Sequence, residues 1–182
     1  MNNTIFKPFI WFLLGIPFIF LLGSFMHFAY DLSGKSTLIG IFAPVNESIW
    51  EHLKLSVYPT FAWFILGYLL FESKINIYNW FTSCLVSVIM SALIVVCFYY
   101  TYTGALGIHS LFLDIFSLFL GILIAQCLAF HIYTYGNTNT LVFIISLILS
   151  FIIFITFTKF TFSPPKFPIF MDPVTKQYGI QK

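Results

Sequence analysis

The stretch LVFIISLILSFIIFITFTKFTF, residues 141–162, carries a single charged side chain and decides the fold class. An α-helix needs about 20 consecutive apolar residues to cross the ~30 Å hydrocarbon core of a membrane. Four further runs of this kind lie at residues 9–30, 53–71, 80–100 and 111–131. The sequence therefore predicts an all-α, polytopic transmembrane bundle of about five helices.

Composition points the same way. Hydrophobic residues make up 60% of the chain and charged residues 8%, whereas about a quarter of an ordinary soluble protein is charged. Five spans with short links use up the 182 residues, so we expect a transmembrane helical domain over residues 1–162 and no separate soluble domain. The segment SPPKFP that follows cannot continue a helix, which predicts an extended Pro-rich C-terminal tail over residues 163–182.

Several functions are excluded or disfavoured by what the sequence lacks. The chain contains no arginine, so no bidentate guanidinium clamp can hold a phosphate or carboxylate. No basic stripe interleaved with aromatic residues is present, which argues against a nucleic-acid partner and leaves the lipid bilayer as the main one. The three cysteines, Cys84, Cys97 and Cys127, fall inside apolar runs without a C-x-x-C pair and are expected to be small buried hydrophobes.

Polar residues are predicted to gather on one side of the membrane. Five crossings place the link between helices one and two, the link between helices three and four, and the tail on the same face. Five of the six acids and three of the four histidines fall there: Asp31, Glu47, Glu51, Asp114, Asp172, His27, His52 and His109. Most lysines lie on this face as well, so the positive-inside rule predicts that it is cytoplasmic in a multi-pass cell-membrane protein.

Residues 44–54, PVNESIWEHLK, form the densest polar segment. Ser48-x-x-Glu51 has the form of a helix-capping box, which accounts for these two residues structurally. Capping does not account for Glu47, which would stack on Glu51 at a spacing of four, where like charges repel unless a cation or proton lies between them. Nor does it account for His52, which follows directly.

Two other histidine–acid pairs are expected near the same boundary. His27 and Asp31 are four residues apart at the end of the first helix and share a helix face. His109 precedes the fourth helix, and Asp114 lies in its first turns, where the helix dipole also favours an acid.

Histidines and carboxylates are the ligands that Zn²⁺ and similar ions prefer. The sequence therefore predicts a metal site built from His27, Asp31, His52, His109 and Asp114, with Zn as the candidate cofactor and Glu47 or Glu51 as the general base. A proton relay or polar substrate pocket, and simple structural pairing, are the alternatives.

A resemblance covers nearly the whole chain. The segments HFAYD at residues 27–31, PVNESIWEHLK at 44–54, YTG at 102–104 and the tail motifs PP, DP and YG resemble a family of small bacterial integral membrane proteins that carries a domain-of-unknown-function label. Phenylalanine-, isoleucine- and lysine-rich usage fits a bacterial source. The resemblance implies the membrane fold and almost nothing about function.

Three functions remain open. The leading hypothesis is a metal-dependent intramembrane hydrolase acting on a lipid or lipid-linked substrate. The cluster of histidines and acids at helix ends is weakly similar to that of intramembrane hydrolases of the alkaline ceramidase and adiponectin receptor type. The chain has fewer helices, however, and lacks their second paired-histidine motif. The second is a small cation- or proton-coupled transporter or permease subunit, for which a homo-oligomer would supply the missing half. The third is a structural or partner-binding membrane protein whose tail, residues 163–182, docks across the polar face or onto another protein.

Overall fold

The structure is a computed structural model that describes residues 7–180, and this part of the chain is all-helical. Five long helices form the bundle: α1 (Pro8–Leu32), α4 (Lys54–Phe71), α5 (Ile77–Leu106), α6 (Leu111–Tyr135) and α7 (Thr140–Phe162). Short pieces connect them: α2 (Thr37–Phe42), α3 (Ile49–His52), and the 3₁₀ turns η1 (Glu72–Lys74) and η2 (Pro168–Phe170). The predicted all-α class is confirmed.

Each of the five predicted spans corresponds to a helix long and apolar enough to cross a membrane. The second span combines α3, α4 and η1 over Ile49–Lys74. Polar side chains begin the later helices, because Asn76, Ser110 and Asn139 each accept a hydrogen bond from a backbone amide of the first turn. The chain is therefore a membrane-embedded helical protein.

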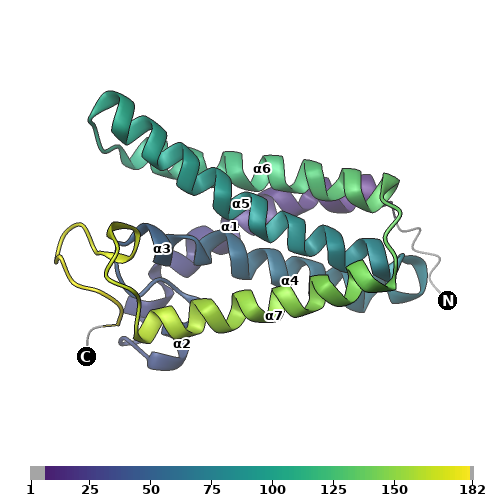
Figure 1. Ribbon diagram of the computed structural model, residues 1–182, viewed down its shortest axis with the longest axis horizontal. Helices are drawn as coiled ribbons and strands as arrows, with labels where there is room; N and C mark the ends of the chain where they lie inside the picture. Colours follow the sequence, from purple (N-terminus) through teal and green to yellow (C-terminus); the bar gives the residue numbers. More distant parts are fainter. Residues whose placement is uncertain (1–6, 181–182) are drawn as a thin grey trace.

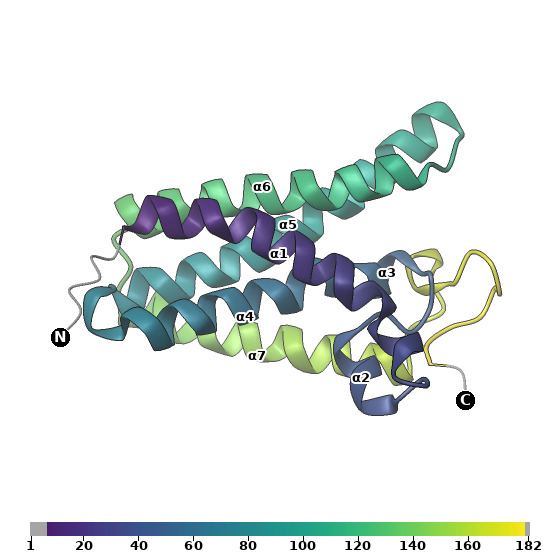
Figure 2. The same cartoon turned by 180° about the vertical axis from the view of Figure 1, so that it is seen from behind.

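The long helices run alternately up and down, as the crossing parity predicted (Figure 1). The start of α1, the α4–α5 link and the α6–α7 turn lie at one end. The 33–53 link with α2 and α3, the α5–α6 turn and the tail lie at the other (Figure 2). At that end, the tip of the α5–α6 hairpin diverges from α3 and the tail in both views.

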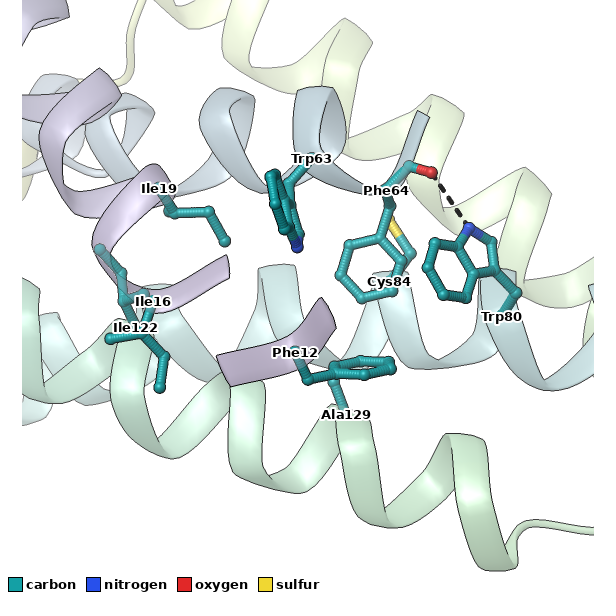
Figure 3. Packing of buried hydrophobic residues seen from close by; sticks show 9 residues of the cluster. All are labelled: Phe12, Ile16, Ile19, Trp63, Phe64, Trp80, Cys84, Ile122 and Ala129. Carbon is teal, nitrogen blue, oxygen red and sulfur yellow. Dashed lines mark hydrogen bonds between the residues drawn. The ribbon is translucent and has the colours of Figure 1, made fainter. Parts of the chain in front are cut away.

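Aromatic, branched aliphatic and small residues fill the centre of the bundle (Figure 3). Phe12 of α1, Phe64 of α4 and Trp80 of α5 pack together, and Trp80 Nε1 donates a hydrogen bond to the Phe64 carbonyl at 3.1 Å. Cys84 is buried in this cluster, as expected. The same expectation was wrong for Cys97 and Cys127, whose side chains lie on the outside of the bundle. Inside a membrane an apolar residue can face lipid as readily as the core.

The tail is not extended, contrary to prediction. It turns through η2, Met171 and Tyr178 form an isolated antiparallel bridge, and the Ile180 amide donates to the Thr161 carbonyl at 2.8 Å. Left-handed backbone at Lys176 and Gly179 reverses the chain. The prolines do stop α7, but the segment then folds back on the end of the bundle.

Candidate metal-binding site

His27, Glu47 and His52 converge at the end of the bundle that carries the tail. One possible ligand atom from each lies within 4.8 Å of the others. His52 Nε2 is 3.4 Å from Glu47 Oε2, and the rings of His27 and His52 are 5.2 Å apart. No other such trio of histidine, cysteine or acidic side chains occurs in residues 7–180. Three of the seven residues that the sequence predicted for the site are thus brought together.

The close approach of α1 to α4 brings His27 into the group. Gly23 lies one turn before His27, and a Cβ atom at Gly23 would be 2.1 Å from the Leu55 carbonyl oxygen. Only glycine allows the two backbones to come so near. His27 then lies beside α3, which continues into α4.

The turn before α3 sets the direction of Glu47. Asn46 Oδ1 accepts from the Ser48 amide at 2.9 Å, and Ser48 Oγ accepts from the Glu51 amide at 3.3 Å, so the predicted capping by Ser48 is present. The helix begins only at Ile49, and Glu47 therefore precedes it. The expected stacking of Glu47 on Glu51 was wrong, because Glu47 lies outside the helix and its carboxylate faces His52, whereas Glu51 pairs with Lys54.

Hydrogen bonding fixes the orientation of the His52 ring. His52 Nδ1 lies 2.9 Å from the Ser48 carbonyl, which can only accept, so Nδ1 carries the proton. In the neutral ring, Nε2 then presents its lone pair toward Glu47. His27 Nδ1 is buried and has no hydrogen-bond partner among the described residues. Metal-binding histidines are commonly held by a backbone carbonyl in the way that Ser48 holds His52.

Glu51 does not join the group but forms a separate buried node. Its Oε2 atom accepts from Lys54 Nζ at 2.7 Å and from the Val45 amide at 3.0 Å. Lys54 also donates to Thr161 Oγ1 at 2.7 Å. With 2% of its side chain exposed, Glu51 has no access to a substrate.

Asp31, His109 and Asp114 lie outside the group as well. Asp31 is exposed, one turn beyond His27. His109 Nδ1 is 3.3 Å from Tyr99 Oη, and Asp114 Oδ1 accepts from Tyr102 Oη at 2.6 Å. These contacts are internal to the α5–α6 hairpin, whose tip stands away from α3 (Figure 1).

The match to a family model covers residues 1–180 and is to a family of unknown function, DUF6512. The chain belongs to this family. Comparisons with curated proteins and with solved structures give no match. Membership agrees with the resemblance drawn from the sequence, while the expected bacterial origin of this DUF6512 chain stays a prediction.

Sequence reasoning missed one feature that stabilises the site of this DUF6512 member, namely the burial of Lys54, which had been counted only as a charge on the polar face. Its spacing of three from Glu51 in a helical segment was a readable signal for pairing. Docking of the tail across the polar face was among the hypotheses, but its hydrogen bond with Asn46 in the segment before α3 was not predicted, because a long-range contact leaves no local pattern.

Proposed function

We propose that the protein is a metal-dependent hydrolase of the membrane boundary, in which His27, Glu47 and His52 bind a divalent cation such as Zn²⁺. The convergence of three ligand atoms within 4.8 Å is the observation that carries this proposal. Asp31, His109 and Asp114, predicted as ligands from sequence, are left out of it because they lie elsewhere.

The composition of the trio favours a cation over simple pairing. Two imidazoles and one carboxylate are a ligand set used by catalytic zinc sites, which keep one position open. A single His52–Glu47 contact would satisfy both partners at a surface. It gives no reason for the second imidazole, that of His27, whose buried Nδ1 lacks a partner among residues 7–180. Two imidazoles next to one carboxylate are better explained by a shared positive ion.

A bound divalent cation supplies Lewis acidity and an activated water for hydrolysis. In this chain the residues' part is to hold the ion and leave access to it. His52 and Glu47 keep 30% and 54% of their side-chain surface exposed, so the site is open. Glu51, predicted as a general base, is buried against Lys54, and the proposal assigns it no catalytic step.

A lipid or lipid-linked substrate suits the position of the site. His27 lies in the last turns of a membrane-spanning helix, and its neighbours Phe25 and Phe28 expose 64% and 60% of their surface. In a bilayer these side chains contact lipid, so a lipid headgroup can approach the trio from the membrane plane. The distribution of lysines supports a cytoplasmic orientation of this face, by the positive-inside rule.

Metal analysis of the purified full chain tests the cation. We expect about one equivalent of Zn²⁺ or a similar ion per chain, lost in His27→Ala and in His52→Ala. His131→Ala is the matched control, because His131 lies near the other end of α6 and contacts Tyr135. A wild-type chain without bound metal after zinc supplementation contradicts the proposal.

Hydrolysis is tested separately, in vesicles of mixed phospholipids and acylated lipids followed by mass spectrometry. Turnover of any species by the wild-type chain but not by Glu47→Gln supports the enzyme. Metal binding without turnover of any lipid would contradict the hydrolase and would be consistent with a membrane protein that only binds a cation.

The transporter alternative has less support. Transporters commonly bind their substrate at helices that are broken near the middle of the membrane, whereas α1, α5, α6 and α7 are each continuous through their spans.

A further inference from the structure

The proposed site has two halves that different parts of the chain hold in place. α1 carries His27 as part of a long helix packed on α4 and α6. Glu47 and His52 belong instead to a loop and a four-residue helix, α3. α3 is a single turn that joins α4 at Leu53, so its position depends on α4 and on what packs against its other sides.

The tail contacts this second half through hydrogen bonds. Asn46 Nδ2 donates to the Gly179 carbonyl at 3.0 Å, across 133 residues of sequence. Asp172 is 5% exposed, and the backbone amide of Glu47 is among the groups that lower the pKa of its carboxyl. The same carboxylate accepts from the Val174 amide at 2.7 Å and from the Thr175 amide at 3.1 Å. Asp172 therefore links the turn of the tail to the residue that presents the Glu47 side chain.

Aromatic packing fastens α3 itself. The Trp50 ring stacks on Phe157 of α7 at 4.5 Å and packs against Phe170 of η2 at 4.8 Å. Phe160 and Phe170 are 5.3 Å apart and complete the cluster. His52 lies two residues after Trp50, so its position on α3 depends on packing against both α7 and the tail.

We propose that the tail over residues 163–180 is a clasp that positions Glu47 and His52, with Asp172 as its main positioning residue, so that cation binding and tail docking stabilise each other. This inference rests on the proposed function, because the property that it regulates is the affinity of the His27–Glu47–His52 trio for a divalent cation. Coupling between two binding events is reciprocal. A docked tail raises the affinity for the cation, and a bound cation holds the tail down.

The experiment measures both sides of the coupling in the full chain in detergent. Zn²⁺ affinity is measured by competition with a chromophoric chelator. Tail docking is measured as the rate of tryptic cleavage after Lys166 and Lys176, both exposed. Cleavage after the exposed Lys35 in the 33–53 link is the internal reference, because global unfolding accelerates all three cuts.

Two variants release the tail in different ways. Asp172→Ala removes the buried carboxylate. Asn46→Asp keeps the acceptor for the Ser48 amide but places a negative oxygen against the Gly179 carbonyl. Glu72→Gln, which removes an acid at the other end of the bundle, is the matched control. Asp172→Asn keeps an acceptor oxygen and should restore much of the docking.

We expect Asp172→Ala and Asn46→Asp each to accelerate tail cleavage and to weaken Zn²⁺ binding about tenfold, the lower end of what groups that orient metal ligands contribute. Zn²⁺ should slow tail cleavage in the wild-type chain and not in His27→Ala. Faster tail cleavage with unchanged Zn²⁺ affinity overturns the clasp and leaves the metal site intact. Unchanged tail cleavage in both variants also overturns it. If the wild-type chain binds no Zn²⁺, the proposed function is contradicted before any variant is compared.

Discussion

Lys54 Nζ lies 2.7 Å from Glu51 Oε2 inside the bundle, with exposed fractions of 0% and 2% for the two side chains. The ammonium group also donates to the Gly40 and Ala43 carbonyls at 2.7 and 3.3 Å. Together these bonds tie the 33–53 link to α4. A charge buried so completely is tolerated only when it is paired and hydrogen-bonded.

Removing the lysine should be far more damaging than its place on the polar face suggests. Lys54→Met leaves the Glu51 carboxylate buried and unpaired, and we expect the free energy of unfolding to fall by about 3–5 kcal/mol. Thermal unfolding in detergent measures the loss, with the exposed Lys166→Met as control. The double variant Glu51→Gln/Lys54→Met should lose less than the sum of the single variants. Additive losses would show that the pair is not coupled.

Gly23→Ala should separate α1 from α4. The new Cβ would meet the Leu55 carbonyl oxygen at 2.1 Å, and a backbone atom cannot move aside as a flexible side chain can. We expect a loss of about 1–3 kcal/mol of stability, as for other overpacked contacts. Zn²⁺ affinity should fall too, because His27 lies one turn further along α1.

Gly104→Ala is the matched control for this substitution. Gly104 lies within α5, and no atom comes within 4 Å of a Cβ there. Alanine should stabilise the helix by up to about 1 kcal/mol. Equal effects of Gly23→Ala and Gly104→Ala would mean that close helix packing at Gly23 is unimportant.

The fold, and the end of the bundle at which the acids and histidines gather, were predictable because both follow from local patterns. A run of about 20 apolar residues specifies a span by itself, and counting the spans assigns each link to a side. The cap at Ser48 follows from a short motif in the same way.

The position of each histidine along the bundle axis was not predictable, and this position decides which histidines come together. The sequence placed the end of the third span at residue 100, where tyrosines and threonines dilute the apolar run. α5 instead continues to Leu106, six residues and about 9 Å further. His109 is therefore carried beyond the level of α3 on a protruding hairpin. Counting the spans assigns a residue to one side of the membrane but does not give its distance along the bundle axis.

Acid should release the tail through Asp172. Burial favours its neutral form, but hydrogen bonds from the Val174 and Thr175 amides outweigh burial and hold the pKa of this carboxyl below its ordinary value of 3.8. A lowered folded-state pKa contributes stability that is present above 3.8 and lost as the pH falls through the folded value. Docking should thus be independent of this group at neutral pH and weaken below pH 3.8.

A spin label on Val174→Cys in a cysteine-free chain reports this release, since Val174 is 78% exposed. Its mobility should rise as the pH falls below 3.8, and Asp172→Asn should flatten that part of the profile. An identical acid profile in Asp172→Asn would assign the transition to other carboxyls.

His109→Ala and Asp114→Asn test whether the hairpin residues, which the sequence predicted as metal ligands, belong to the trio. His109 contacts Tyr99, and Asp114 accepts from Tyr102 at 2.6 Å, so their losses should be felt within the α5–α6 hairpin. We expect wild-type Zn²⁺ affinity in both variants. We also expect up to about 1 kcal/mol less stability in Asp114→Asn, since a neutral amide oxygen accepts the hydrogen bond from Tyr102 more weakly than a carboxylate does. Tyr102→Phe, which removes this bond, should lose at least as much stability. A fall in Zn²⁺ affinity in His109→Ala comparable to that in His27→Ala would mean that the hairpin closes over α3 when the cation binds.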